Sequence, residues 1–219
     1  LEHRPVRKTG YMVIPSDRGL AGPYNANVLR LVSSTLRERH HSQEEYVLFV
    51  LGRKGRDYFT KRGYPVVASV VGLSDTPSLE EIKDISTKAI SMFADQTFDK
   101  LVIFYNEFVS PLVQKPVEKQ LLPLASEEVL SGPVSTYDYE PDSETVLEVL
   151  LPKYAETLIY SALLDAKASE FGARMTSMGN ATDNATEMIE RLTLEYNRAR
   201  QASITQEIAE IVAGANALS

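Results

Sequence analysis

The chain has 219 residues, enough for one ordinary domain and an additional part, or for one large domain. Acidic residues (30) outnumber basic ones (23), and the resulting formal net charge of −7 argues against a general nucleic-acid binder. The absence of cysteine excludes disulfides, thiol catalysis and cysteine-ligated metal centres. No run approaches the roughly eighteen apolar residues of a membrane span, so no part is expected to cross a bilayer.

Histidine offers little for a metal site. The chain has only His3, His40 and His41, and two of these are adjacent, whereas ligands on a helix stand three or four residues apart. We therefore expect no metal and no cofactor. The chain begins with Leu1 and resembles neither a signal peptide nor a transit peptide there. We expect it to be a fragment or a processed form, with an upstream segment missing.

The first part of the chain alternates between continuous apolar runs and amphipathic segments. Helices are predicted at 24–39, at about 54–62, and after the capping box of Ser78 and Glu81, with a face formed by Ile82, Ile85, Ala89 and Phe93. Strands are predicted at 11–14, 46–51, 66–71, 101–108 and 112–124. Such interleaving indicates an α/β fold: a Rossmann-like, mostly parallel sheet covered by helices, with an antiparallel hairpin around Ser110 and Pro111 at its end. An acidic loop at 126–135 follows.

The second part of the chain is typical of one very long helix. None of the 11 prolines lies after Pro152, and proline costs roughly 3 kcal/mol inside a helix. Asp142 is a plausible N-cap, and Pro152 is expected to kink or restart the helix. Sixty helical residues would extend roughly 90 Å, more than a domain of this size can cover. The sequence thus predicts an α/β head at 1–141 and a long helix at 142–219.

The long helix carries two candidate packing surfaces. Ala162, Ala166, Ser169 and Ala173 form a stripe of small residues where another helix could approach closely. Farther on, apolar residues recur every three or four positions, close to a coiled-coil seam. The seam consists of Met178, Ala181, Ala185, Met188, Leu192, Tyr196 and Ala199. Charges among the last twenty residues are limited to Arg200, Glu207 and Glu210, so this tip needs an apolar environment supplied by a partner.

Two motifs were considered for chemistry. The turn Ser16–Gly22 leads from a strand into a helix and resembles a phosphate-binding turn, since free N–H groups at a helix start attract anions. It matches no nucleotide fingerprint, and neither does Gly52–Gly55, so a structural turn is the simpler interpretation. Tyr137 and Glu140 belong to an exposed aromatic and acidic segment that by composition alone is a hinge. No catalytic triad or carboxylate pair can be assembled, which favours a mechanical or interaction role.

Several motifs resemble the gamma subunit of F-type ATP synthase. The C-terminal run from Ile204 to Ala215 is similar to the family signature I-T-x-E-x-x-E-x-x-x-G-A, and the segments 168–175 and 196–203 also match. The turn Ser16–Gly22 with the following Tyr24 and Asn25 adds to the resemblance. The lack of cysteine and of the extra loop of chloroplast members favours a bacterial relative. The family opens with a long amino-terminal helix that winds against the C-terminal one, and this chain starts just after it.

The resemblance implies a central-stalk rotor without catalytic residues of its own. In the family, the long helix is one half of an antiparallel coiled coil inside a hexamer of alpha and beta subunits. The head contacts the epsilon subunit and the membrane c-ring, whose proton-driven rotation is coupled to ATP synthesis or hydrolysis. The implied location is the cytoplasmic face of the bacterial cell membrane, as a peripheral part of the complex, with no nucleic-acid partner.

The resemblance also implies contact residues. Arg174, Arg200, Gln201, Thr205 and Glu207 match positions that touch the beta subunits and govern coupling. Tyr137 and Glu140 match positions near the polar loops of the c-ring, and the hairpin region is expected to meet epsilon. Two alternatives remain open from the residues alone: a nucleotide-binding α/β enzyme that uses the Ser16–Gly22 turn, and a structural protein that self-associates through the seam at 178–199.

Overall fold

A computed structural model describes residues 5–124 and 143–217. The chain divides into two compact units, Leu1–Thr176 and Ser177–Ser219. The predicted acidic loop at 126–135 and the predicted N-cap Asp142 lie outside the described residues.

The first unit is built on a five-stranded sheet with the strand order β3-β2-β1-β4-β5. The strands are β1 (Thr9–Val13), β2 (Tyr46–Leu51), β3 (Val66–Val70), β4 (Lys100–Ser110) and β5 (Val113–Leu122). Strand β1 pairs in parallel with β2 and β4, β2 pairs in parallel with β3, and β5 returns antiparallel to β4. The mostly parallel sheet with a hairpin at its edge is therefore confirmed.

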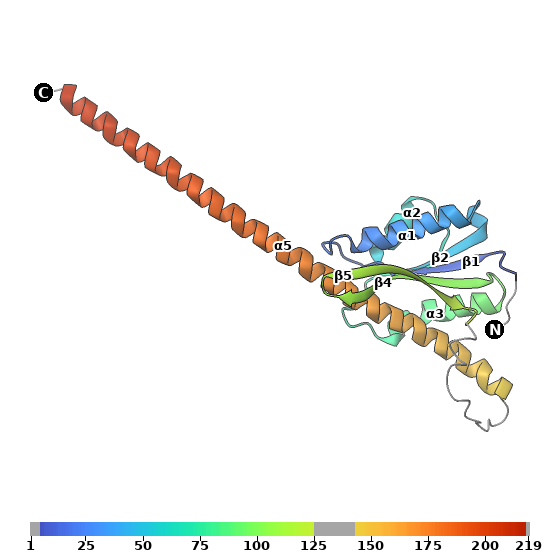
Figure 1. The fold of residues 1–219 in the computed structure, drawn as a ribbon. Coiled ribbons are helices and arrows are strands. Elements are labelled where there is room, and N and C mark those ends of the chain that lie inside the picture. The colour runs from blue at the N-terminus through green and yellow to red at the C-terminus, as the bar shows by residue number, and fades with distance from the viewer. Residues whose placement is uncertain (1–4, 125–142, 218–219) are drawn as a thin grey trace. The chain divides into compact units, whose positions relative to one another are not determined.

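Helices cover both faces of this sheet (Figure 1). The helices α1 (Tyr24–Arg39) and α2 (Arg53–Lys61) pack on one face, and α3 (Leu79–Ala94) and the start of α5 (Ser143–Ala217) on the other. Successive side chains of a strand point to opposite faces. Accordingly, Tyr11 and Val13 of β1 join the α1/α2 core, while Met12 belongs to the α3/α5 core. All of β1 and β2 is buried, which explains their continuous apolar runs.

The helix starts agree with the predictions to within a residue. Ser78 and Glu81 form the expected capping box at the start of α3, where Ser78 N–H donates to Glu81 Oε1 at 2.9 Å. Ser74 donates to the same carboxylate from its N–H and its hydroxyl, and these backbone donors keep the pKa of Glu81 below its usual value. The prediction of a restart at Pro152 is wrong, because α5 continues through this residue. Pro152 is exposed and does not end the helix.

The first unit includes the beginning of α5. Its inner face, with Ala155, Ile159 and Leu163, belongs to the core beneath the sheet. The compact unit therefore extends to Thr176, beyond the end of the predicted head at residue 141. The predicted division at 141/142 marks the place where the long helix is expected to begin. As a boundary between folding units it stays a prediction.

The second unit is the helical segment from Ser177 onward. From Met178 to Ala217 every residue is exposed except the half-buried Asn197. Its local hydrogen bonds are those of an isolated helix: Thr182, Thr186 and Thr193 each donate to the carbonyl four residues before them. Within residues 5–124 and 143–217, no helix has the length and hydropathy needed to cross a membrane.

Candidate subunit-contact sites

The turn after β1 is held by its own side chains. Ser16 is buried, and its hydroxyl donates to the Arg18 carbonyl at 2.6 Å. The Asn25 amide closes the other side, since its Oδ1 accepts from Ser16 N–H at 2.9 Å. These bonds fix the path of the chain from β1 into α1.

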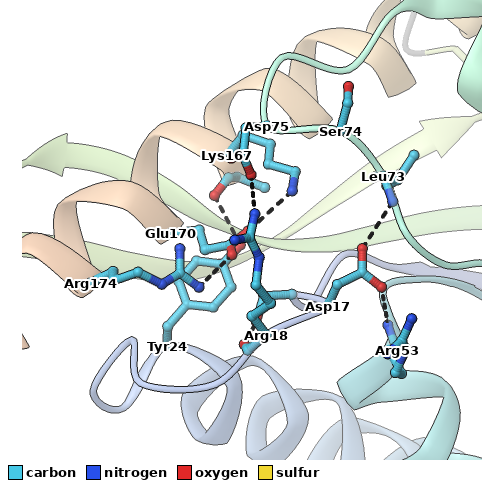
Figure 2. Close-up of polar contacts among 12 residues, drawn as sticks. Asp17, Arg18, Tyr24, Arg53, Leu73, Ser74, Asp75, Lys167, Glu170 and Arg174 are labelled. Carbon is cyan, nitrogen blue, oxygen red and sulfur yellow. Dashed lines mark hydrogen bonds and ion pairs between the residues drawn. The ribbon is translucent and has the colours of Figure 1, made fainter.

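Asp17 ties this turn to two neighbouring segments (Figure 2). Its Oδ1 accepts from the N–H of Arg53 at the start of α2 and from the N–H of Gly72, both at 2.9 Å, and Oδ2 accepts from Leu73 N–H at 3.1 Å. Beside it, Arg18 pairs with Asp75 at 2.5 Å. A carboxylate near a helix N-terminus accepts a hydrogen bond from a free backbone N–H and interacts favourably with the positive end of the helix dipole.

Two glycines allow the start of α2 to approach this turn. Gly52 has φ 126°, and a Cβ there would collide with the backbone carbonyl of Pro15. A Cβ on Gly55 would collide with the Pro15 ring and lie 2.9 Å from Val50 Cγ1. The pair Gly52 and Gly55, which resembles a phosphate-binding pattern in sequence, therefore serves close backbone packing.

The Ser16–Gly22 turn is consequently a structural junction. The anion that a phosphate-binding turn would hold is replaced by the chain's own Asp17 carboxylate, which already accepts a donor from the start of α2. A phosphate group placed there would meet a like charge. This geometry favours the structural interpretation of the motif over the nucleotide-binding alternative.

Tyr24 joins the junction to α5. Its hydroxyl donates to the Ala166 carbonyl at 2.9 Å, and its own carbonyl accepts from Asn106 Nδ2 at 3.0 Å. Burial of the ring, followed by the negative charge of Glu170, raises the pKa of Tyr24 far above its usual value. The phenol therefore stays protonated, and its hydrogen bond to the Ala166 carbonyl helps to fix the position of α5 against the sheet.

Glu170 is the centre of a buried charge cluster on α5 (Figure 2). Its side chain is 5% exposed and accepts from Arg174 at 2.7 Å, while Lys167 Nζ lies 3.4 Å from its other oxygen. Arg174 also donates to the Gly19 carbonyl at 3.4 Å. Of the predicted beta-contact residues, Arg174 alone thus lies in the first unit, where it connects α5 to the turn and leaves 23% of its side chain exposed.

The small-residue stripe has a different role from the one expected. Ala162, Ala166, Ser169 and Ala173 are all buried within the first unit. Ala162 and Ala166 pack under the sheet, and Ala173 packs against Ala21 and Tyr24. The prediction that another helix approaches this stripe is wrong: small side chains are needed because α5 lies so close to its own domain.

The hairpin of β4 and β5 contacts the same stretch of α5. Asp165 accepts from Phe108 N–H at 3.0 Å, and the Thr176 hydroxyl donates to the Pro111 carbonyl at 3.1 Å. A Cβ on Gly172 would lie 3.2 Å from the Pro111 backbone. The tip of the hairpin nevertheless exposes apolar side chains: Phe108, Val109, Leu112 and Val113.

The other four predicted beta-contact residues, Arg200, Gln201, Thr205 and Glu207, lie in the second unit and are exposed. None forms a side-chain hydrogen bond or ion pair with any residue in the ranges that the structure describes. At 3.6 residues per turn, Gln201 and Thr205 share one face of α5, and Arg200 and Glu207 share another. The helix thus presents two polar strips among apolar neighbours.

Large apolar side chains surround these strips. In the second unit the exposed ones are Met178, Met188, Ile189, Leu192, Leu194, Tyr196, Ile204, Ile208, Ile211 and Val212. Exposure reaches 71% at Ile211 and 67% at Tyr196. An exposed apolar surface of this extent marks a site of interaction with another protein chain. The predicted c-ring residues Tyr137 and Glu140 lie outside the described residues.

Comparison with known proteins identifies the family. A family model described as ATP synthase matches residues 1–218. The ATP synthase gamma chain of Brevibacillus brevis is 62% identical over 217 residues, which cover 99% of this chain and 76% of that relative. The chain belongs to the ATP synthase gamma-chain family. It is accordingly a gamma-type rotor subunit of a membrane-associated complex and not a catalytic subunit.

Solved structures share the gamma-chain fold. The central stalk and c-ring structure of the Tetrahymena thermophila mitochondrial ATP synthase has a TM-score of 0.67 at 24% identity, covering 83% of this chain and 79% of that one. A structure of the Euglena gracilis mitochondrial enzyme in rotational state 3 has a TM-score of 0.71 at 19% identity, covering 97% and 73%. The similarity of fold therefore extends over nearly the whole chain.

Sequence reasoning missed the residues that anchor α5 in this gamma-family chain. In sequence, Asp17 and Tyr24 stand out only as members of the motif around the Ser16–Gly22 turn, and Glu170 belongs to none of the predicted contact sites. A usable signal existed for Glu170, because it stands three residues after Lys167 and four before Arg174, at spacings that bring side chains together on a helix. No comparable signal links Tyr24 to Ala166, 142 residues away.

Proposed function

We propose that this gamma-family chain is the central-stalk rotor of a bacterial F-type ATP synthase, turning inside the hexamer of alpha and beta subunits. The main support for this proposal is the second unit, a helix from Ser177 onward that has large exposed apolar side chains and no buried residue. Such a helix requires a surrounding protein surface. Only three of the chain's last twenty residues are charged, which suits a bearing, because a strongly charged shaft would bind at a few fixed angles instead of turning smoothly.

The two polar strips are the proposed coupling contacts. Gln201 and Thr205 offer uncharged hydrogen-bonding groups on one face, and Arg200 and Glu207 offer opposite charges on the other. Their side chains have no partner among the described residues of this chain, so they are available to the beta subunits. We propose that they favour particular angular positions of the shaft and transmit torque there.

Substitutions in the assembled complex test this assignment. Gln201→Leu and Glu207→Lys are expected to reduce ATPase turnover or proton pumping about 10-fold, as loss of a charged or buried interface hydrogen bond would. Gln206→Leu, the same amide replacement on the face of α5 that carries neither strip, and Glu187→Lys, the same charge change on an exposed residue of α5, are the matched controls. Equal turnover and pumping in all four variants would refute the residue assignment while leaving the family unaffected.

Arg174 is proposed to couple the shaft to the head. Its exposed part is available to a beta subunit, while its bond to Glu170 anchors it in the first unit. Arg174→Lys keeps the charge but cannot bond Glu170 and the Gly19 carbonyl in the same geometry. We expect Arg174→Lys to reduce clearly the number of protons pumped per ATP hydrolysed. The free energy of unfolding of the head, measured in urea, should change proportionally less. An unchanged ratio of pumping to hydrolysis would contradict this role.

The head is proposed to face the c-ring and epsilon on the cytoplasmic side of the bacterial membrane. Tyr137 and Glu140 are the proposed c-ring contacts, and the apolar hairpin tip supports the assignment of epsilon to that region. Because the chain has no cysteine, Tyr137→Cys and Leu112→Cys each introduce a unique thiol. In the whole complex these are expected to cross-link to the c-ring and to epsilon, respectively. If neither the c-ring nor epsilon becomes cross-linked, both assignments are refuted.

A self-associating structural role is the second candidate, because the same exposed apolar seam could pair with a copy of itself. Sedimentation equilibrium of the chain decides between the two. The rotor proposal predicts that any dimer is displaced when alpha and beta subunits are added. A homodimer that persists in their presence would favour self-association.

A further inference from the structure

A second feature of the first unit lies away from α5, at the end of the sheet formed by the amino ends of β2 and β3. There a cavity of about 310 Å³ opens to solvent between the ends of α1 and α2. Its lining includes Arg37, His40, His41, Ser42, Arg62 and Tyr64, and it contains no acidic residue. We call it the amino-end pocket. In a chain with a net charge of −7, this local excess of basic groups is unexpected.

The two arginines of the amino-end pocket retain unused hydrogen-bond donors. Arg37 donates from Nε to the Ser33 carbonyl at 3.1 Å, and Arg62 donates from Nη1 to the Tyr58 carbonyl at 3.3 Å. Arg62 also stacks on the Tyr58 ring at 3.9 Å, which fixes its guanidinium plane. Neither side chain forms an ion pair with a carboxylate in the described part of the chain. Each guanidinium has five N–H groups, so most of its donors remain available.

The carboxylate of Glu45, two residues from the lining residue Gln43, already has hydrogen-bond partners. Glu45 accepts from His41 N–H at 3.0 Å and lies 3.3 Å from His40 Nδ1, while the other ring nitrogen of His40 bonds Tyr11 at 2.8 Å. Arg39, the next cation on α1, is neutralised by Glu118 on β5. Arg37 and Arg62 are therefore the arginines of the lining, and neither is held in an ion pair within the part of the chain that the structure describes.

Helix dipoles explain only part of this arrangement. Both α1 and α2 end here, and a basic side chain near a helix C-terminus is favourable. That effect does not require a hollow lined by hydroxyl, imidazole and guanidinium donors from the end of α1 and from the segments that follow α1 and α2. Paired arginines with hydroxyl donors around a shared cavity are the chemistry that recognises phosphate groups.

We propose that the amino-end pocket binds a phosphate group through Arg37 and Arg62. The group could be carried by a soluble phosphate compound or by an anionic phospholipid of the membrane with which the complex is associated. The inference is independent of the proposed shaft contacts, because it uses no residue of α5.

Titration of the complete chain with pyrophosphate at constant ionic strength tests the pocket, with the backbone amide resonances of residues 40–43 and 62–64 as the readout. We expect saturable shifts at these positions. Arg37→Gln and Arg62→Gln should each weaken binding about 10-fold, since each removes charged hydrogen bonds. Arg30→Gln is the matched control, because it removes an exposed arginine of α1 that does not line the pocket.

Vesicles distinguish the two sources. If phosphatidylglycerol vesicles sediment the chain, and only Arg37→Gln and Arg62→Gln abolish this, the phosphate belongs to a lipid. Saturable pyrophosphate binding with no vesicle binding assigns it to a soluble compound. The proposal is overturned if neither ligand binds, or if Arg30→Gln weakens binding as much as the pocket variants, since general charge attraction would then suffice. Near-UV circular dichroism checks that each variant remains folded.

Discussion

Replacing Glu170 by alanine should destabilise the first unit strongly. The substitution leaves Lys167, whose side chain is 10% exposed, without its carboxylate partner. Breaking one side of a buried ion pair costs about 3 kcal/mol or more, because the remaining charge stays desolvated. Arg174 contributes less to this cost, since it is 23% exposed and can turn toward water. For a unit of this size, about 3 kcal/mol corresponds to a fall of roughly 6–12 °C in Tm.

The assay must report on the first unit and not on the helix that follows it. Buried tyrosines of the head, among them Tyr11, Tyr24 and Tyr46, make near-UV circular dichroism during urea unfolding suitable. Far-UV signal at helical wavelengths would be dominated by α5. The free energy of unfolding is obtained by linear extrapolation to water.

A control with the same spacing separates burial from charge. Glu80 and Lys83 on α3 are three residues apart, as Lys167 and Glu170 are, and they belong to the same unit, but their side chains are 78% and 57% exposed and their charged atoms are 3.5 Å apart. Lys83→Ala should therefore cost less than about 0.5 kcal/mol. The double variant Lys167→Met with Glu170→Leu should recover most of the loss, because apolar residues of similar size often replace a buried pair without penalty. A Glu170→Ala cost below about 1 kcal/mol would refute this reasoning.

Three further predictions concern the junction and the helix. Folding raises the pKa of Tyr24, so the neutral phenol contributes its full stability below about pH 10, the usual tyrosine pKa. Above that pH the free energy of unfolding should fall by about 1.4 kcal/mol per pH unit. Tyr24→Phe should remove this slope when urea unfolding is measured at alkaline pH. Gly55→Ala should destabilise the first unit by about 1–3 kcal/mol, because the added Cβ collides with Pro15. Gly179→Ala, which has no atom near the added Cβ, should stabilise the helix by up to about 1 kcal/mol. Thermal melts measure both effects, and equal effects would contradict the packing argument. Ser169→Ala should be neutral or stabilising by up to about 1 kcal/mol, because among the described residues its buried hydroxyl has no hydrogen-bond partner, and a clear loss of stability would reveal one.

The alternating strands and helices of the head could be predicted because each is encoded locally. Apolar runs without polar interruption mark strands buried on both faces, and Ser78 with Glu81 marks a helix start within four residues. The expected parallel sheet follows from those runs, because helices must cover both of its faces. The family could be predicted as well, since the C-terminal signature is a continuous stretch of sequence.

The role of the residues around α5 could not be predicted in the same way. Tyr24 and Ala166, or Asp17 and Leu73, come together only through the packing of distant segments. The stripe of small residues is compatible with a neighbouring helix or with the chain's own sheet, and helical periodicity is the same in both cases. Pro152 likewise satisfies the local rule for a break, yet the helix continues past it.

The sequence by itself determined that the chain contains an α/β head and a long helix with a weakly charged tip, because residue periodicity and proline placement act over short distances. Tertiary structure alone decided how far the first compact unit extends along that helix, to Thr176, and which side chains hold the helix there. It also decided that Asp17 fills the turn that resembles an anion site and that basic residues gather at the other end of the sheet. Apart from the spacing of Lys167, Glu170 and Arg174 along α5, these features depend on approach between segments that are far apart in the chain, and local patterns do not record them.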